Sequence, residues 1–230
     1  MSEPLISLSG VSVKVRENTL LSDVSFSVRD GERVAVLGAN GAGKSTLLRI
    51  CNALLLPSSG TANVPSPIDQ ALIFQRPLLL KRSALENVSF ALLARGIPKH
   101  VAIRAASEAL EACGLSAFTN RYARSLSGGE QQKLALARAW ALSPKLLLAD
   151  EPTASLAPAA VHAVEAIFQS MAERGTSYVF ATHNRGQAKR LATRVVFLAD
   201  GCIVEDRPVQ DFFSNPQSAA AIEYLNVEKV

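Results

Sequence analysis

The sequence contains few of the residues that mark secreted, metal-binding or membrane-spanning proteins. Its 3 cysteines and 3 histidines lie far apart along 230 residues and lack the spacing of metal ligands. Scattered cysteines in odd number are typical of reduced thiols in a cytosolic core. No apolar run approaches the roughly 18 residues that a spanning helix needs, and the first residues lack the basic and apolar regions of a signal peptide. We therefore expect a cytosolic chain without a transmembrane segment or a signal peptide.

Aromatic residues are also scarce, at 6% of the chain, while hydrophobic residues make up 48%. Such a composition suits a core of valine, leucine, isoleucine and alanine. The net charge of +4 is concentrated between Arg76 and Arg124, where eight Lys and Arg face three Glu. A basic surface can meet water, an anionic membrane face or nucleic acid. Because no aromatic residues are interleaved for base stacking, we expect no nucleic-acid partner, and the other two readings stay open.

One glycine-rich stretch carries the strongest chemical signal. It lies between an apolar run at residues 33–37, which is typical of a buried strand, and a helical pattern that starts at Leu47. The stretch fits the phosphate-loop pattern G-x-x-x-x-G-K-S, in which free backbone N–H groups at a helix N-terminus bind anions. We expect Lys44 to reach the β- and γ-phosphates of a nucleoside triphosphate and the Ser45 hydroxyl to bind Mg²⁺. The predicted nucleotide-binding residues are Gly38, Ala39, Asn40, Gly41, Ala42, Gly43, Lys44, Ser45 and Thr46.

The order of apolar patterns predicts one α/β domain over residues 1–230. Residues 5–15 and 24–28 alternate apolar and polar side chains, which favours a small antiparallel layer at the start. Strands then alternate with helices, as in a mainly parallel sheet flanked by helices. Helical patterns between two of these strands predict an inserted helical subdomain at about 76–142, and the tail at 209–226 predicts two short helices. The predicted core strands are 33–37, 71–74, 146–148, 178–181 and 195–198.

Two further stretches carry polar groups suited to phosphate chemistry. An apolar strand ends at Asp150, which places a carboxylate at the edge of the sheet where ligands bind. We expect Asp150 to hold Mg²⁺ and Glu151 to polarise the water that attacks the γ-phosphate. Ser127, Gly128 and Gly129 begin a helix and form a second potential anion site. One triphosphate does not need two such sites from one chain, so two chains could each lend this element to the other.

The order of these motifs resembles the ATPase subunit of ATP-binding cassette (ABC) transporters over nearly the whole chain. The resemblance rests on the phosphate loop, Gln75, the signature at Leu126 to Glu130, the stretch Asp150-Glu151-Pro152-Thr153 and Thr182-His183. It implies that Gln75 contacts Mg²⁺ and relays the nucleotide state to a permease. It also implies that the signature residues Ser127, Gly128, Gly129 and Glu130 act on ATP held by the partner cassette, and that His183 steadies the γ-phosphate.

The same resemblance implies the partners of the chain and its cellular location. A homodimer of cassettes would bind two ATP molecules with Mg²⁺ and would drive a separate transmembrane permease at the cytoplasmic face of the cell membrane. An extracytoplasmic solute-binding protein would supply the substrate. The catalytic residues expected on this basis are Glu151, His183, Lys44 and Gln75, and the expected Mg²⁺ ligands are Ser45, Gln75 and Asp150.

Two positions depart from the family pattern. Val15 stands where the family usually has an aromatic residue that stacks on adenine, so we place Val15 beside the base. The stretch Ala154-Ser155-Leu156-Ala157 replaces the usual Ser-Ala-Leu-Asp, so the aspartate that links the two ATP sites is missing at Ala157. The usual coupling between the sites is therefore in doubt, although nucleotide binding is not.

One stretch of the sequence bears on the transported substrate. Residues 74–83 resemble the cassettes of tungstate and related oxyanion importers, which favours a tungstate-like substrate. The alternatives are an importer of another small solute, an exporter or a lipoprotein-release system. DNA-repair ATPases share the phosphate loop and signature but place a long coiled coil between them, and this chain leaves no room for one. A nucleotide-binding module without turnover disagrees with the presence of Lys44, Asp150, Glu151 and His183.

Overall fold

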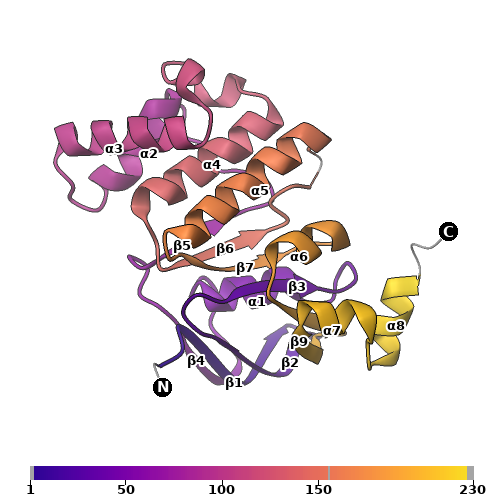
Figure 1. The fold of residues 1–230 in the computed structure, drawn as a ribbon. Coiled ribbons are helices and arrows are strands. Elements are labelled where there is room, and N and C mark those ends of the chain that lie inside the picture. Colours follow the sequence, from indigo (N-terminus) through magenta and orange to yellow (C-terminus); the bar gives the residue numbers. More distant parts are fainter. Residues whose placement is uncertain (1–2, 155, 227–230) are drawn as a thin grey trace.

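The computed structural model describes residues 3–154 and 156–226. Two sheets and a set of helices form successive layers, with a three-stranded sheet at the bottom of Figure 1 and a six-stranded sheet above it. Helix α1 (Lys44–Cys51) lies between the sheets, while α4 (Gly128–Leu142) and α5 (Pro158–Glu173) lie beyond the larger sheet. The prediction of an α/β fold with an antiparallel layer and a helical subdomain is confirmed.

The small sheet is antiparallel, as its alternating sequence predicts. Its order is β2-β1-β4, formed by β1 (Ile6–Val15), β2 (Asn18–Val28) and β4 (Ser59–Asn63). The sequence analysis did not predict β4, because its residues SGTAN are polar and largely exposed. Gly60 makes this pairing possible: it has φ +84°, and a Cβ there would lie 2.3 Å from the Gly10 carbonyl oxygen.

The large sheet has the order β5-β6-β7-β3-β8-β9. All pairs are parallel except β8–β9, which is an antiparallel hairpin at the edge. The predicted core strands are confirmed, whereas β9 was missed because exposed and charged residues interrupt its apolar pattern. The strands are β3 (Arg33–Leu37), β5 (Gln70–Ile73), β6 (Leu146–Asp150), β7 (Ser177–Ala181), β8 (Arg194–Ala199) and β9 (Cys202–Pro208).

The helices α2 (Ala84–Leu93) and α3 (Lys99–Ala112) pack with α4 at the end of the molecule far from the small sheet (Figure 1). They form the predicted helical insert between β5 and β6. Helix α6 (Arg185–Leu191) follows β7. The tail forms the two short helices that the sequence predicts, α7 (Val209–Ser214) and α8 (Ala219–Asn226).

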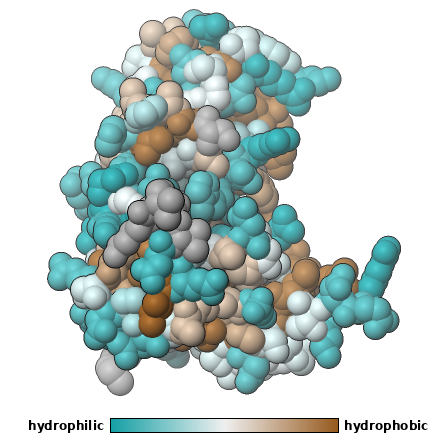
Figure 2. Space-filling view, turned by 90° about the vertical axis from the view of Figure 1, so that its right-hand side faces the viewer, coloured by the Kyte–Doolittle hydropathy of each residue, from teal (hydrophilic) through white to brown (hydrophobic). Residues whose placement is uncertain are grey.

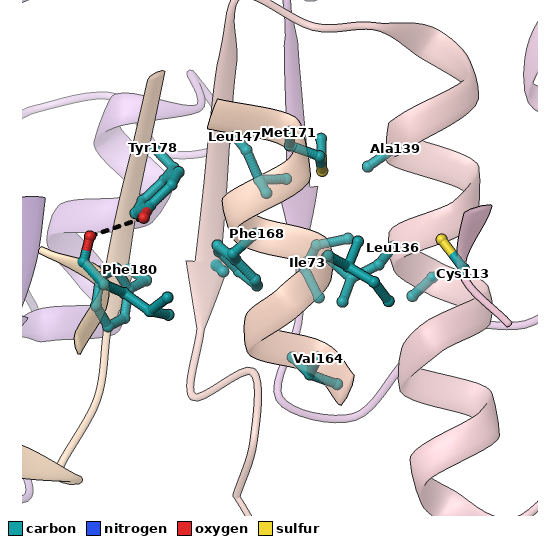
Figure 3. Close-up of a cluster of buried hydrophobic side chains, with 14 of the residues drawn as sticks. Ile73, Cys113, Leu136, Ala139, Leu147, Val164, Phe168, Met171, Tyr178 and Phe180 are labelled. Atoms are coloured by element: carbon teal, nitrogen blue, oxygen red, sulfur yellow. Dashed lines mark hydrogen bonds between the residues drawn. The ribbon is translucent and has the colours of Figure 1, made fainter. Parts of the chain in front are cut away.

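A buried cluster lies between the large sheet and the helices beyond it (Figure 3). The rings of Phe168 and Tyr178 meet edge to face with centroids 5.3 Å apart. The Tyr178 hydroxyl donates a 2.7 Å hydrogen bond to the Leu191 carbonyl, and burial raises the pKa of Tyr178 to about 12. A second cluster fills the space between the two sheets around α1. The two clusters hold the large sheet from both faces, so the ends of its strands are fixed in place.

Two of the three cysteines are core thiols, as the sequence predicts. Burial raises the pKa of both Cys51 and Cys113 to about 12, so neither forms a reactive thiolate near neutral pH. Cys202 is only partly buried and points its sulfur toward the Ser22 carbonyl.

The outer surface is mixed in character. Figure 2 shows one face on which hydrophilic residues predominate and hydrophobic residues gather in small groups. Within residues 3–154 and 156–226, no helix has both the length and the apolar character needed to cross a membrane.

Candidate functional site

Four neighbouring parallel strands bring most of the predicted site residues together at the carboxyl ends of the strands, which form one edge of the large sheet. The order β5-β6-β7-β3 places Gln75 first, then the Asp150–Glu151 pair, then His183, then the phosphate loop. The register pairs Asp150 with Ala181, and Ala181 with Val36. Because parallel strands end at the same edge, residues more than 140 positions apart in sequence meet there.

The phosphate loop, residues 38–43, needs glycine at two positions for steric reasons. Gly38 has φ +147°, and a Cβ there would lie 2.3 Å from the Leu198 carbonyl oxygen. Gly43 has φ +104° and caps the N-terminus of α1, where a Cβ would lie 2.8 Å from the Leu20 carbonyl oxygen. No side-chain hydrogen bond caps α1. The first backbone N–H groups of this helix therefore face the loop, as an anion site requires.

Lys44 lies across this loop with only 7% of its surface exposed. Its ammonium group donates hydrogen bonds to the carbonyls of Gly38, at 2.8 Å, and Ala39, at 2.9 Å. Burial lowers the pKa of Lys44 from its usual value, and the nearby carboxylates of Glu151 and Asp150 act in the opposite direction. A positive charge is thus held over a concave backbone surface.

A cavity of about 550 Å³ opens along this edge of the sheet. It brings together loop residues and all four residues predicted from the other strand ends. Gly38 and Ala39 contribute to the loop through their carbonyls rather than to the cavity wall. The lining residues are Leu20, Asn40, Gly41, Gly43, Lys44, Ser45, Thr46, Gln75, Asp150, Glu151 and His183.

Glu151 and His183 form a pair within the cavity. The Glu151 Oε2 atom lies 2.8 Å from His183 Nδ1 and also accepts a 3.4 Å hydrogen bond from the His183 backbone N–H. Glu151 has φ +47°, a conformation that costs a non-glycine residue on the order of 1–3 kcal/mol and that often marks functional sites. Its side chain is 12% exposed, while that of His183 is 62% exposed. The carboxylate is therefore sheltered and the imidazole faces the open side.

The oxygen-bearing groups of the cavity suit Mg²⁺. The Ser45 hydroxyl, the Gln75 amide and the Asp150 carboxylate are hard oxygen donors on its wall. In the described part of the chain, no three His, Cys, Asp or Glu residues gather closely enough to cage a metal. Mg²⁺ commonly binds through one or two protein oxygens together with water and substrate phosphates, so this donor set fits that ion.

The cavity wall includes Leu20 but not Val15, the residue predicted to lie beside the base. Val15 ends β1 with 49% of its surface exposed, and it does not appear on the cavity wall. Leu20, at 37% exposure, does line the cavity. The sequence analysis missed Leu20 because nothing in an alternating strand singles out one leucine. Only the folded structure identifies Leu20, because its carbonyl oxygen lies close to Gly43 of the phosphate loop.

The signature residues lie apart from this cavity. Ser127 caps α4: its hydroxyl accepts a hydrogen bond from the Glu130 N–H, while the Ser127 N–H donates to Glu130 Oε2 at 2.7 Å. The Ser127 hydroxyl also donates a 2.8 Å hydrogen bond to Glu130 Oε2. This bond first, and then the bond from the Ser127 N–H, lowers the pKa of Glu130 below its usual value. Gly129 allows α4 to approach α5, because a Cβ there would lie 2.9 Å from the Ala160 Cβ. Among the described residues that line the cavity of the phosphate loop, none belongs to the signature.

The departure around Ala157 also has a structural consequence. Ala157 stands at the N-cap of α5 with φ −65° and ψ 150°, and it offers no side-chain hydrogen bond to the helix. The neighbouring Ser155 lies outside the described residues. Helix α5 therefore begins without the cap that an aspartate could supply.

Comparisons with known proteins agree with this geometry. The sequence model of the family described as "ABC transporter" matches residues 21–154. The chain is 36% identical to the glutamate transport ATP-binding protein GluA of Corynebacterium efficiens and 37% identical to the glutamine transport ATP-binding protein GlnQ of Escherichia coli. Each alignment covers 96% of this chain and 98% of the relative.

A solved structure repeats the fold. The dimeric structure of the ATP-binding cassette MJ0796, bound to ADP and phosphate after hydrolysis, superposes with a TM-score of 0.81 at 28% identity. The match covers 89% of this chain and 98% of that one. Family, relatives and strand-edge cavity agree, and the chain belongs to the ABC transporter family as an ATP-hydrolysing cassette.

Proposed function

We propose that the chain is the ATPase subunit of an importer for polar amino acids, working at the cytoplasmic face of the membrane with a separate permease. The observation that carries the proposal is the convergence of the phosphate loop, Gln75, Asp150, Glu151 and His183 on one cavity. The amino acid substrate is proposed from the similarity to GluA and GlnQ, which are ATP-binding proteins of glutamate transport and of glutamine transport. These relatives lend no support to the tungstate-like substrate and favour the alternative of another small solute.

The residues of the cavity divide the chemistry of hydrolysis among them. The backbone N–H groups of the loop and the Lys44 ammonium would bind the β- and γ-phosphates. Glu151 would accept a proton from a water molecule as its oxygen attacks the γ-phosphorus, and the bond to the β–γ bridging oxygen breaks to leave ADP and phosphate. His183, held by Glu151 at 2.8 Å, would donate a hydrogen bond to the γ-phosphate.

Mg²⁺ would neutralise charge on the phosphates when bound, and Ser45, Gln75 and Asp150 are the residues to hold it. All three residues line the same cavity as Lys44, which supports this role.

A second copy of the chain would complete the site. Ser127, Gly128 and Gly129 lie at an exposed helix N-terminus outside the chain's own cavity, which supports a role on the nucleotide of a partner. The MJ0796 cassette is dimeric, which supports a head-to-tail pair here.

The test of the substrate is reconstitution. The cassette is co-purified with its permease and a solute-binding protein in proteoliposomes, and ATPase activity is measured with glutamate, glutamine, tungstate or no substrate. Stimulation by an amino acid and not by tungstate is the expected result. Stimulation by tungstate alone would overturn the assignment, and Glu151→Gln serves as the inactive control.

A further inference from the structure

The loop of residues 74–83, here called the glutamine loop, connects Gln75 in the cavity to α2. Residues 74–82 have no regular secondary structure, so most of the loop's carbonyls need partners from elsewhere. Two of those partners are arginine side chains of the segment that carries the signature, Arg124 and Arg138.

The contacts are specific and successive. Arg138, on α4, donates through Nη1 to the Leu78 carbonyl at 3.0 Å. Arg124, three residues before Ser127, donates through Nε and Nη2 to the Leu79 carbonyl at 3.3 Å each. Both arginines thus join the signature segment to adjacent residues of the glutamine loop.

Asn87 fixes the far end of the same loop. It accepts a hydrogen bond from the Leu80 N–H at 2.8 Å and donates to the carbonyls of Arg82, at 3.2 Å, and Ser83, at 2.9 Å. Only residues 76 and 77 separate Gln75 from the first carbonyl held by an arginine, and residue 77 is a proline with a fixed φ. Because this connection is short and restricted, a displacement of α4 should also move Gln75.

Stability alone does not account for this arrangement. Burial lowers the pKa of Arg138, and within the described chain no carboxylate lies at ion-pair distance from it. A partly buried guanidinium that meets a carbonyl rather than a carboxylate gains little in return for its lost hydration. Arg124 is exposed, and an exposed side chain costs little when removed.

We propose that Arg124 and Arg138 are positioning residues that couple Gln75 to Ser127. The Ser127 segment, which would contact the partner's ATP, then moves together with Gln75, which would contact the chain's own ATP. This inference rests on the proposed roles of Gln75 and Ser127. It also offers a route between the two ATP sites in a chain that lacks an aspartate at Ala157.

The first experiment measures the link without nucleotide or metal. Hydrogen exchange of the peptide spanning residues 76–82 is followed in the full chain, in Arg124→Ala and in Arg121→Ala. Arg121 is a matched control, since it is exposed, lies three residues away, and its side chain contacts Ser125 and Phe118 rather than the loop. Faster exchange at residues 76–82 in Arg124→Ala alone is expected; equal exchange in all three proteins contradicts the proposal.

The second experiment asks whether Arg124 acts through Gln75. Losing a hydrogen bond worth about 1 kcal/mol corresponds to roughly a 5-fold change. We expect Arg124→Ala to lower kcat about 5-fold while KM for ATP changes less than 2-fold, with partial rescue in Arg124→Lys. In a Gln75→Ala background the same substitution should change kcat less than 2-fold. If Arg124→Ala lowers kcat about 5-fold both in the wild type and in the Gln75→Ala background, the coupling is contradicted.

The two proposals fail in distinguishable ways. If Gln75→Ala has normal ATPase activity, the assigned role of Gln75 is wrong, whatever the exchange data give. If Gln75→Ala is impaired but Arg124→Ala behaves like Arg121→Ala in both experiments, the role of Gln75 stands and the link is wrong.

Discussion

Glu151 is the residue on which we expect hydrolysis to depend most directly. Its strained backbone at φ +47° and its bond to His183 aim the carboxylate into the cavity. Glu151→Gln keeps the shape but removes the base, so ATP binding should persist while turnover falls by on the order of 10²- to 10⁴-fold. Steady-state ATPase assays beside nucleotide affinity measure both quantities. Near-normal turnover in this variant would remove Glu151 from the mechanism.

Leu20 is expected to contact the nucleotide more than Val15 does. Leu20 lines the cavity, whereas Val15 lies half exposed away from its wall. Leu20→Ala removes part of one apolar contact, worth about 1 kcal/mol, and should weaken ATP affinity about 5-fold. Val15→Ala should change it less than 2-fold. Competition with a fluorescent ATP analogue decides between them, and the reverse ranking would restore Val15 to the base.

An aliphatic contact has little power to distinguish bases. Stacking on an aromatic ring is worth about 1–3 kcal/mol in nucleic-acid sites, and neither Val15 nor Leu20 can stack. GTP should therefore bind nearly as well as ATP. Because Val15 lies away from the cavity wall, Val15→Tyr should leave the ATP affinity unchanged, and tighter ATP binding in this variant would place residue 15 beside the base.

At the scale of elements, α5 lacks a capping side chain at its N-cap position, although the backbone conformation there would allow one. Ala157 has the extended φ and ψ of a capping residue. Ala157→Asp should supply a side-chain acceptor and raise the free energy of unfolding by about 0.5–2 kcal/mol. Thermal or urea unfolding measures the change. The control is Ala159→Asp, which places the same side chain at the second residue of the helix instead of at the N-cap. A destabilised Ala157→Asp protein would show that the residue is not a free cap.

The start of α4 should depend on pH through Glu130. Its pKa is lowered from 4.5 by bonds from Ser127, so the ionised carboxylate is the form that the fold favours. The stability contributed by Glu130 is complete above about pH 4.5 and is lost as the pH falls through the lowered value. The difference in unfolding free energy between wild type and Glu130→Gln should therefore shrink on acidification. A difference that stays constant from about pH 7 to pH 3 would exclude this titration.

The elements also show what the sequence could and could not reveal. Apolar strands such as residues 33–37 and 146–148 were predictable, because burial on both faces demands continuous hydrophobic runs. Strand β4 was not, because backbone pairing and the close approach at Gly60 hold it rather than its polar side chains. The phosphate loop and Asp150 were predictable from local motifs. Leu20 and the arginine contacts to the glutamine loop were not, since tertiary packing alone brings them to the site.

At the scale of the whole molecule, we propose that one chain holds one half of each of two different sites. The cavity at the sheet edge carries the phosphate loop, Glu151 and His183, while Ser127 lies outside it at the start of α4. Two chains arranged head to tail would place each Ser127 segment over the partner's nucleotide. Mixing Lys44→Ala with Ser127→Arg chains should then leave at most one workable site in each heterodimer.

The most direct test of this arrangement is the mass of Glu151→Gln in solution. Light scattering on the purified chain with ATP and Mg²⁺ should give a dimer, because closure is no longer relieved by hydrolysis, and without nucleotide it should give a monomer. Adding Ser127→Arg to Glu151→Gln should return the mass to that of a monomer while ATP still binds to the phosphate loop. A Glu151→Gln chain that stays monomeric with bound ATP, or a dimer indifferent to Ser127→Arg, would contradict the composite site.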